Sequence, residues 1–296
     1  MKTYENNNCY KFKKITYTNG LLDDAVDATY IIHLEGNGRY EDILKQLELY
    51  QSTKIVYIVF NKGYKNCSKG EHIQLPAQDL VDAFLQTFKH AKQENYENVL
   101  ILEDDFIFSE KIKDVSTQKN ICTFLNNHKN ENFQYLLGCM PLIEMPYTFD
   151  GNHFKNVLSL GTHACIYSKI NREQLLKREQ KYITDWDVYN NYYFRRYTYY
   201  EPLCYQLFPD TENSNNWGNT NYLYYLSGLT IKKIFKFFKL DTQIEPGYSF
   251  FYLFSKILFF ILLFIILLIV FLIFYYAYIF IYKIKNTKVK NTKVKR

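Results

Sequence analysis

The six cysteines of this 296-residue sequence form no CxxC pair, and no stretch rich in proline, glycine or serine divides the body of the chain. Without paired cysteines a zinc site is not expected, and without a linker we expect one folded body. The scattered cysteines indicate reduced, mostly packed thiols of a cytosolic protein. They are Cys9, Cys67, Cys122, Cys139, Cys165 and Cys204.

The body of the chain also lacks an excess of positive charge. The formal net charge is +6, but the last fourteen residues hold seven basic residues and no acidic one, which leaves −1 for the rest. A protein that reads nucleic acid carries its positive charge on a folded face. A nucleic-acid partner is therefore not expected.

The N-terminus has no apolar stretch of signal-peptide length, so nothing in it predicts transfer into the secretory lumen. By contrast, residues 257–282 contain no charge and are nearly all Ile, Leu, Phe or Tyr. As a helix they would extend about 39 Å, against a hydrocarbon core of about 30 Å. A buried core helix would be shorter and would have a polar stripe. We therefore expect a single transmembrane helix over residues 250–282, which anchors a cytosolic domain in membrane lipid.

The regions on either side of this helix are basic. The tail, residues 283–296, would have to cross the membrane if the domain is cytosolic, which opposes the positive-inside tendency. Upstream, residues 229–249 include the stretch TIKKIFKFFKL, which separates apolar from lysine side chains as an amphipathic helix does. Such a helix would lie on an anionic bilayer. The alternative is an ordinary surface helix of the globular domain.

Three short apolar runs, residues 28–34, 54–60 and 98–102, alternate with helical patterns that end near residue 50 and cover residues 76–93. Strand and helix in alternation predict right-handed βαβ units and a parallel sheet. The continuous apolar character of the runs fits burial on both faces of that sheet. After residue 108 the pattern is irregular, so we expect an α/β domain with a Rossmann-type sheet that becomes mixed in its second half.

Three carboxylates, Glu103, Asp104 and Asp105, directly follow the third run. An open parallel sheet binds its ligands beyond the carboxyl ends of its strands. Three acids at a buried strand end repel one another, and their pKa values rise unless a cation joins them. Oxygen ligands suit Mg²⁺ or Mn²⁺, which often accompany a phosphate-bearing substrate. A helix cap or a solvated turn is the alternative interpretation.

Five segments of the sequence resemble motifs of glycosyltransferase family 25, the lipooligosaccharide glycosyltransferases and procollagen galactosyltransferases. VLILEDDFIF resembles the family's Glu-Asp-Asp motif. The further matches are YIIHLEGNGRYEDIL, GTHACIYSKI, ITDWDVYNN and PLCYQLF. The sequence departs from the family at Cys165, where a Tyr is usual, and at His33, where an Asn is common. The amino-acid composition indicates an A/T-rich genome, which fits a version of the family from a large DNA virus.

The resemblance implies a GT-A-like fold over residues 28–228, preceded by an extension over residues 1–27. It implies transfer of a hexose, with inversion, from a nucleotide-diphosphate sugar such as a UDP-hexose to a hydroxyl of a glycan, protein or lipid acceptor. In this interpretation Asp105, with Asp104 or Glu103, holds Mn²⁺ or Mg²⁺ against the diphosphate, and Glu103 is alternatively a ribose contact or a partner of the metal ligands.

The resemblance also suggests roles for five residues outside the acidic run. Asp185 is the expected catalytic base and Asp187 the second candidate, with N-capping of a helix as the alternative for both. His163 is a candidate metal ligand or acceptor contact, or else a packed core histidine. Arg39 and Gln206 are candidate donor contacts, although each could be a surface or packing residue.

Two other functions stay open. The first is a catalytically inactive relative that serves as a membrane-tethered binding module; failure to bind Mn²⁺ would favour it. The second is a phosphotransferase or phosphatase of another α/β class. Such enzymes normally place a nucleophilic Asp after the first strand, where this sequence has HLEGNG.

Overall fold

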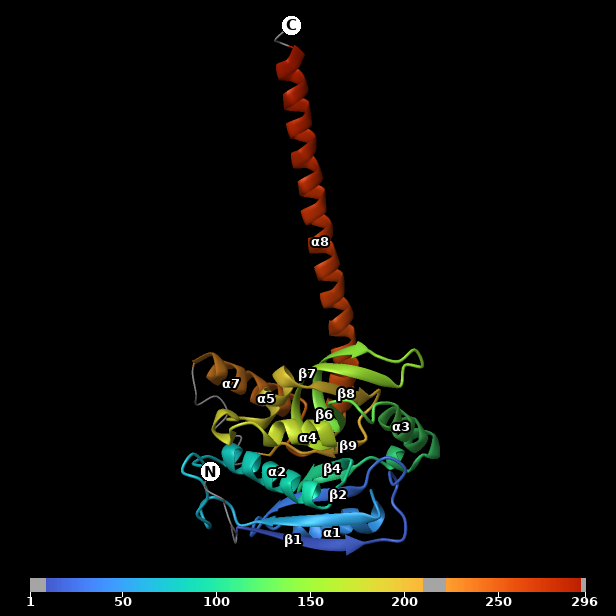
Figure 1. The fold of residues 1–296 in the computed structure, drawn as a ribbon, viewed down its shortest axis with the longest axis vertical. Helices are drawn as coiled ribbons and strands as arrows, with labels where there is room; N and C mark the ends of the chain where they lie inside the picture. Colours follow the sequence, from blue (N-terminus) through green and yellow to red (C-terminus); the bar gives the residue numbers. More distant parts are fainter. Residues whose placement is uncertain (1–8, 210–221, 294–296) are drawn as a thin grey trace.

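In the computed structural model, which describes residues 9–209 and 222–293, seven strands form one mixed sheet in the order β1-β3-β2-β4-β7-β6-β8 (Figure 1). The strands are β1 (Tyr10–Thr16), β2 (Ala28–Leu34), β3 (Ile55–Asn61), β4 (Asn98–Glu103), β6 (Phe133–Pro146), β7 (His153–Ser168) and β8 (Arg195–Tyr199). A second sheet pairs β5 (Phe106–Phe108) with β9 (Cys204–Gln206). The helices are α1 (Tyr40–Leu49), α2 (Pro76–Gln93), α3 (Val115–Asn127), α4 (Lys169–Leu176), α5 (Trp186–Tyr193), α7 (Tyr222–Phe237) and α8 (Gly247–Lys293). The expectation of an α/β domain with a Rossmann-type mixed sheet and a long C-terminal apolar helix is confirmed.

The three apolar runs form the parallel core of the sheet. β2 pairs in parallel with β3 on one side and with β4 on the other, and Ile32 lies opposite Glu103. The carboxyl ends of β2 and β4 therefore lie side by side, which places the acidic run beside the turn that leaves β2. β7 pairs antiparallel to β4, so the parallel part of the sheet ends at β4.

Helices cover both faces of the sheet, and each face has its own buried cluster. α2 begins at Pro76, where the missing N–H of proline costs no helical hydrogen bond. Its buried side chains include Phe84, which stacks on Trp186 of α5 with ring centroids 4.4 Å apart. α1 and α3 pack on the opposite face through residues such as Ile43 and Ile121. Burial of such large side chains contributes roughly 2–3 kcal/mol each.

The first described strand differs from the expected N-terminal extension. β1 pairs antiparallel with β3 along its whole length, from Tyr10 opposite Asn61 to Thr16 opposite Ile55. Residues expected to precede the domain therefore form an edge strand of its sheet. The three lysines of β1 are exposed, which suits an edge strand because charge discourages pairing with other chains.

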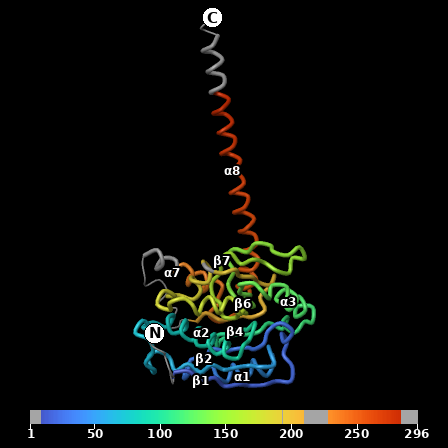
Figure 2. The backbone as a smooth tube through the Cα atoms, in the orientation of Figure 1, coloured from blue at the N-terminus to red at the C-terminus, as the bar shows by residue number. Residues whose placement is uncertain are grey.

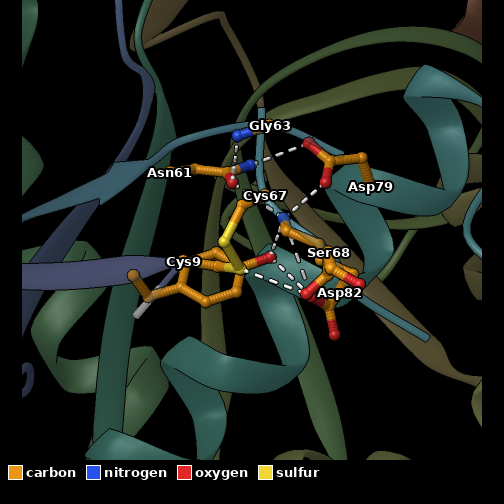
Figure 3. Close-up of a disulfide and its surroundings, with 9 residues drawn as sticks. Cys9, Asn61, Gly63, Cys67, Ser68, Asp79 and Asp82 are labelled. Atoms are coloured by element: carbon orange, nitrogen blue, oxygen red, sulfur yellow. Dashed lines mark hydrogen bonds and ion pairs between the residues drawn. A yellow bond between two sulfur atoms is a disulfide. The ribbon is translucent and has the colours of Figure 1, made fainter. Parts of the chain in front are cut away.

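The expectation that all six cysteines are reduced is wrong for Cys9 and Cys67, which form a disulfide with a Cα–Cα distance of 5.6 Å (Figure 3). The pairing of β1 with β3 explains it. The backbone carbonyl of Cys9 accepts a hydrogen bond from the N–H of Lys62, 3.1 Å away, so Cys9 lies beside the loop that leaves β3. Cys67 lies in the same loop. The other four cysteines are free and buried.

The second half of the domain is built on a long hairpin of β6 and β7. The segments FKNVLSL and HACIYS are both parts of β7. Gly161 lies between them with a φ of +64°, a conformation that L side chains rarely adopt. The backbone can bend there while β7 continues.

The C-terminal helices belong to the folded domain as well as to the candidate membrane span. In α7, Phe235 is buried while Ile234 and Phe237 are exposed, so its apolar residues divide between the domain and the surface. The first turns of α8 are also buried, through residues such as Phe251. The domain therefore extends beyond residue 228, the expected end of the transferase region.

Beyond these turns α8 projects from the domain as one straight helix, at the end opposite to β1 (Figure 2). The stretch Gly247–Lys283 is long and apolar enough to cross a membrane, by length and composition. Its side chains from residue 257 onward are almost all exposed, in contrast to those of a core helix. The last three residues of the expected basic tail lie outside the described residues, as do residues 1–8 and 210–221.

Candidate active site

Asp104 is the most heavily bonded carboxylate of the acidic run. It accepts hydrogen bonds from His33 Nδ1 (3.1 Å), the backbone N–H of Leu34 (3.1 Å) and Asn37 Nδ2 (2.5 Å), and it forms an ion pair with Arg39 Nη1 (2.8 Å). Burial raises its pKa, but the bonds from His33 and Arg39 outweigh this effect, so the pKa is lowered. Asp104 is therefore negatively charged, and its hydrogen bonds connect the end of β4 to the turn after β2.

The turn after β2 can make these contacts because of its two glycines. Gly36 and Gly38 have φ values of +81° and +80°, which a residue with a side chain would adopt only with strain. The turn brings Asn37 and Arg39 back over the strand end. Neither His33, noted in the sequence only as a departure from the family 25 motif, nor Asn37 was expected to bind Asp104; the Gly-Asn-Gly spacing is the sequence signal for a tight turn after β2.

Asp105 lies between a cation and an amide. Arg39 Nη1 is 2.9 Å from Asp105 Oδ2, and Gln206 Nε2 donates to both carboxylate oxygens at 2.9 Å. The pairing of β5 with β9 explains the second contact, because it places Phe106 opposite Gln206. Burial raises the pKa of Asp105, and Arg39 and Gln206 only partly offset this. The structure therefore brings together Asp104, Asp105, Arg39 and Gln206 from separate segments of the chain.

Of the three acids, Glu103 has the fewest interactions that stabilise its negative charge. Within residues 9–209 and 222–293, no hydrogen bond to its carboxylate is present, and the side chain lines a cavity. Burial raises the pKa of Glu103 well above its usual value, and repulsion from Asp105 and Asp187 adds to the rise. The negative charge of this site exceeds what Arg39 alone can neutralise, so a bound cation would stabilise it.

Asp185 and Asp187 begin α5. Asp185 caps the helix, because its Oδ1 accepts from the N–H of Val188 at 2.9 Å. Asp187 accepts from the N–H of Gly161 (2.8 Å) and from the Thr162 hydroxyl (2.6 Å). Burial and the nearby Asp187 raise the pKa of Asp185 to about 6. The helix-capping alternative is thus observed for Asp185.

His163 is packed inside the domain rather than placed with the acids. Its Nε2 lies 3.2 Å from the carbonyl of Cys204, and burial lowers its pKa to about 4. A Cβ on Gly138 would come within 2.3 Å of Nε2, so the ring fills the space that this glycine leaves. The arrangement is that of a neutral core histidine, the alternative that the sequence left open.

The expected metal ligands do not form a preassembled cage. Among the residues that the structure describes, no three His, Cys, Asp or Glu side chains are placed to hold a metal ion. Asp104 is committed to internal bonds and His163 to the core. Mg²⁺ is usually held by one or two carboxylates, with substrate phosphates and water completing its shell. Glu103 and Asp105 fit such a two-carboxylate site.

A cavity of about 240 Å³ lies next to the acidic run. Its lining includes Glu103 and Asp104, residues of the loop after β3 such as Asn61 and Tyr64, and Pro76 at the start of α2. The loop after β3 was not identified as part of the site, because its sequence contains no motif typical of ligand binding.

Buried ion pairs and the disulfide hold this loop in place (Figure 3). Lys69, almost fully buried, contacts Asp79 and lies 3.7 Å from Asp82, both on α2. It also donates to Asn61 Oδ1 at 2.8 Å. These contacts fix the position of the cavity wall relative to β3 and α2.

Comparisons with known proteins give no family for the chain. No family model matches it, and no curated protein matches it. Solved structures with weak likeness include a mannose-1-phosphate geranyltransferase from Thermus thermophilus (TM-score 0.35, 11% identity, covering 58% of this chain and 72% of that chain). The protein A197 from STIV gives a TM-score of 0.34 at 12% identity, covering 62% and 86%. A glycosyltransferase involved in the glycosylation of the major capsid of PBCV-1 gives 0.30 at 9%, covering 56% and 71%. At such low TM-scores none of the three supports an inference about this chain.

Proposed function

We propose that this chain is a membrane-anchored glycosyltransferase that moves a hexose from a nucleotide-diphosphate sugar, such as a UDP-hexose, to an acceptor hydroxyl. The observation that carries the proposal is the group of Glu103, Asp105 and Arg39 at the carboxyl edge of a parallel sheet, next to a cavity. The cavity is somewhat smaller than the roughly 300–1,000 Å³ of typical ligand pockets. It suits one part of a nucleotide sugar, with the remainder extending over the acidic run.

Binding of the donor diphosphate requires positive charge, which the acidic run by itself does not provide. In the proposal Glu103 and Asp105 hold Mn²⁺ or Mg²⁺ when the donor binds, and the ion would neutralise charge on the leaving nucleotide. Arg39 orients Asp105, and Gln206 fixes the same carboxylate from the other side.

Proton transfer from the acceptor is assigned to Asp185. A general base works best when its pKa lies near the operating pH, and Asp185, with a pKa of about 6, is close to that condition. Both oxygens of Asp187 accept hydrogen bonds from β7, so Asp187 serves to hold α5 against β7. In-line attack by the activated hydroxyl would invert the anomeric centre, as the resemblance to family 25 implies. The acceptor is a glycan, a protein or a lipid.

The side of the membrane is part of the proposal. The sequence expectation of a cytosolic domain rested partly on reduced cysteines, and the disulfide between Cys9 and Cys67 removes that ground, since such bonds persist in oxidising compartments. Residues 237–256, before the apolar run, contain two basic residues, whereas residues 283–296 contain seven. The positive-inside tendency therefore places the tail in the cytosol. We propose that the domain lies on the opposite, oxidising side.

A catalytically inactive binding module is the second candidate, and one observation favours it. Arg39 already lies within 2.9 Å of both Asp104 and Asp105, so the two acids are partly neutralised without a metal. In this alternative the cavity would bind a ligand without turning it over.

A turnover experiment tests the proposal. The full chain in lipid nanodiscs is incubated with Mn²⁺ and a panel of nucleotide sugars, with and without saccharide acceptors, and released nucleoside diphosphate is measured. We expect release from one class of donor that stops in Asp105→Asn. Asp185→Asn should keep donor affinity but lose transfer, which separates the two roles. Donor binding without release in any condition would favour the inactive module.

A further inference from the structure

One tyrosine of the membrane helix reaches the candidate site. Tyr248 lies in the first turn of α8 and is fully buried. Its hydroxyl accepts a hydrogen bond from the backbone N–H of Gln206 at 2.8 Å and donates one to the backbone carbonyl of Gln206 at 3.0 Å. A single side chain thus satisfies both main-chain groups of the last residue of β9.

Gln206 in turn contacts the acidic run. The side chain of Gln206 donates to both oxygens of Asp105 at 2.9 Å. A short chain of hydrogen bonds therefore links α8 to Asp105 through one residue. Neither end of that chain is free to shift alone, because a buried N–H or carbonyl left without a partner costs free energy.

α8 is held firmly enough to act as a fixed support. Tyr248, Phe251 and Tyr252 lie in a buried cluster with Met140 of β6. Farther along the helix, Ser255 donates to the buried carboxylate of Glu144 at 2.7 Å. The helix runs without interruption from these turns into the apolar run that begins at residue 257. Tyr248 lies nine positions before the start of that run, which corresponds to about 14 Å of helix.

We propose that Tyr248 is a positioning residue of the site: the first turn of the membrane helix sets the place of Gln206 and, through it, of Asp105. The site is complete only when α8 is docked on the domain, so the membrane anchor and the donor-binding carboxylate form one rigid unit. The inference rests on the proposed function for the role of Asp105 in donor binding, but the hydrogen-bonded chain itself does not.

The test uses the full chain in lipid nanodiscs and two conservative variants. Tyr248→Phe keeps the ring and removes both hydrogen bonds to Gln206. The matched control is Tyr252→Phe, one turn farther along the same helix and also buried, whose hydroxyl has only a weak contact with Cys139 Sγ at 4.0 Å. The probe is uridine diphosphate with Mn²⁺. We expect Tyr248→Phe to lower its affinity about tenfold, because the loss of both hydrogen bonds reaches the ligand only through the position of Gln206, and we expect Tyr252→Phe to leave it unchanged.

A double-variant cycle distinguishes positioning from general loosening. Gln206→Ala removes the amide that holds Asp105 and should lower affinity to a similar extent. If Tyr248 acts through Gln206, the double variant should be no worse than either single variant. Additive losses, equal losses in Tyr252→Phe, or wild-type affinity in Tyr248→Phe would each overturn the inference.

A readout without ligand separates this inference from the proposed function. The side-chain amide protons of Gln206, observed by nuclear magnetic resonance in protein labelled at glutamine, report its bonds to Asp105. They should move toward free-amide positions in Tyr248→Phe and stay in place in Tyr252→Phe. If uridine diphosphate does not bind the wild type, the proposed function fails, and this spectrum alone decides the inference; unchanged resonances in Tyr248→Phe would refute it.

Discussion

Neutralising two neighbouring acids at the end of β4 should have opposite effects on stability. Asp104→Asn removes a buried charge that accepts from three donors and pairs with Arg39. Removing such a buried charge costs about 3 kcal/mol, because the three donors lose a charged acceptor and Arg39 keeps only Asp105 as a partner. For a domain of this size that corresponds to a fall in melting temperature of about 6–12 °C. Glu103→Gln instead removes a charge that the fold disfavours.

The direction of the stability change for each variant follows from the shift in the pKa of the carboxyl group that it removes. The folded-state pKa of Asp104 is lowered, so its carboxylate contributes stability above the unfolded-state pKa, and this is lost as pH falls through the folded value. The folded-state pKa of Glu103 is raised, so the folded state prefers the protonated form, and stability falls as pH rises from the unfolded toward the folded pKa. At pH 7, Glu103→Gln should therefore be neutral or stabilising by about 1 kcal/mol.

Thermal unfolding of the full chain in nanodiscs, followed by circular dichroism at pH 7 without divalent cations, measures both variants. Glutamine and asparagine keep the shape of the acids, so each variant is the packing control for the other. The reasoning fails if both variants lower the melting temperature by the same amount, or if Glu103→Gln is the more damaging one.

Four further predictions concern other parts of the chain. Cys9→Ser should destabilise the domain by about 4 kcal/mol, the entropy of the 58-residue loop that the disulfide closes, and a reductant should lower the melting temperature of the wild type but not of the variant. Transfer should decline below a pH of about 6 as Asp185 becomes protonated, and the residual transfer of Asp185→Asn should not show this decline. A chain that ends at residue 228 should fail to bind donor, because it lacks the buried turns of α8, whereas one that ends at residue 256 should bind; equal binding would contradict the described domain boundary. In sealed microsomes the domain should resist added protease while an epitope on the tail is digested, and digestion of the domain would place it in the cytosol.

The parallel half of the fold was predictable because its signals are local. Continuous apolar runs and the helix that begins at Pro76 identify β2, β3, β4 and α2 with only small shifts at the ends. β1 was not recognised, since an edge strand buries little and its three exposed lysines resemble a solvated segment. The disulfide depends on that strand pairing, so the same omission hid it.

The candidate site was predictable in composition but not in arrangement. The sequence identified Arg39, Asp105 and Gln206 through motif resemblance, and the structure places them in contact. It could not assign separate tasks to Asp104 and Glu103, because these depend on which side chains return from the turn after β2. The contact of Tyr248 with Gln206 could not be predicted for a similar reason. In the sequence Tyr248 begins an apolar helix, and only the folded structure brings it to Gln206.

Calorimetric titration of the full chain with uridine diphosphate in the presence of Mn²⁺ tests the central claim most directly. The proposed function predicts saturable binding that requires Mn²⁺ and is lost in Asp105→Asn, while Tyr252→Phe binds as the wild type does. Absence of binding by this and every other nucleoside diphosphate, in protein whose fold is intact by circular dichroism, would contradict a donor site at the end of β4.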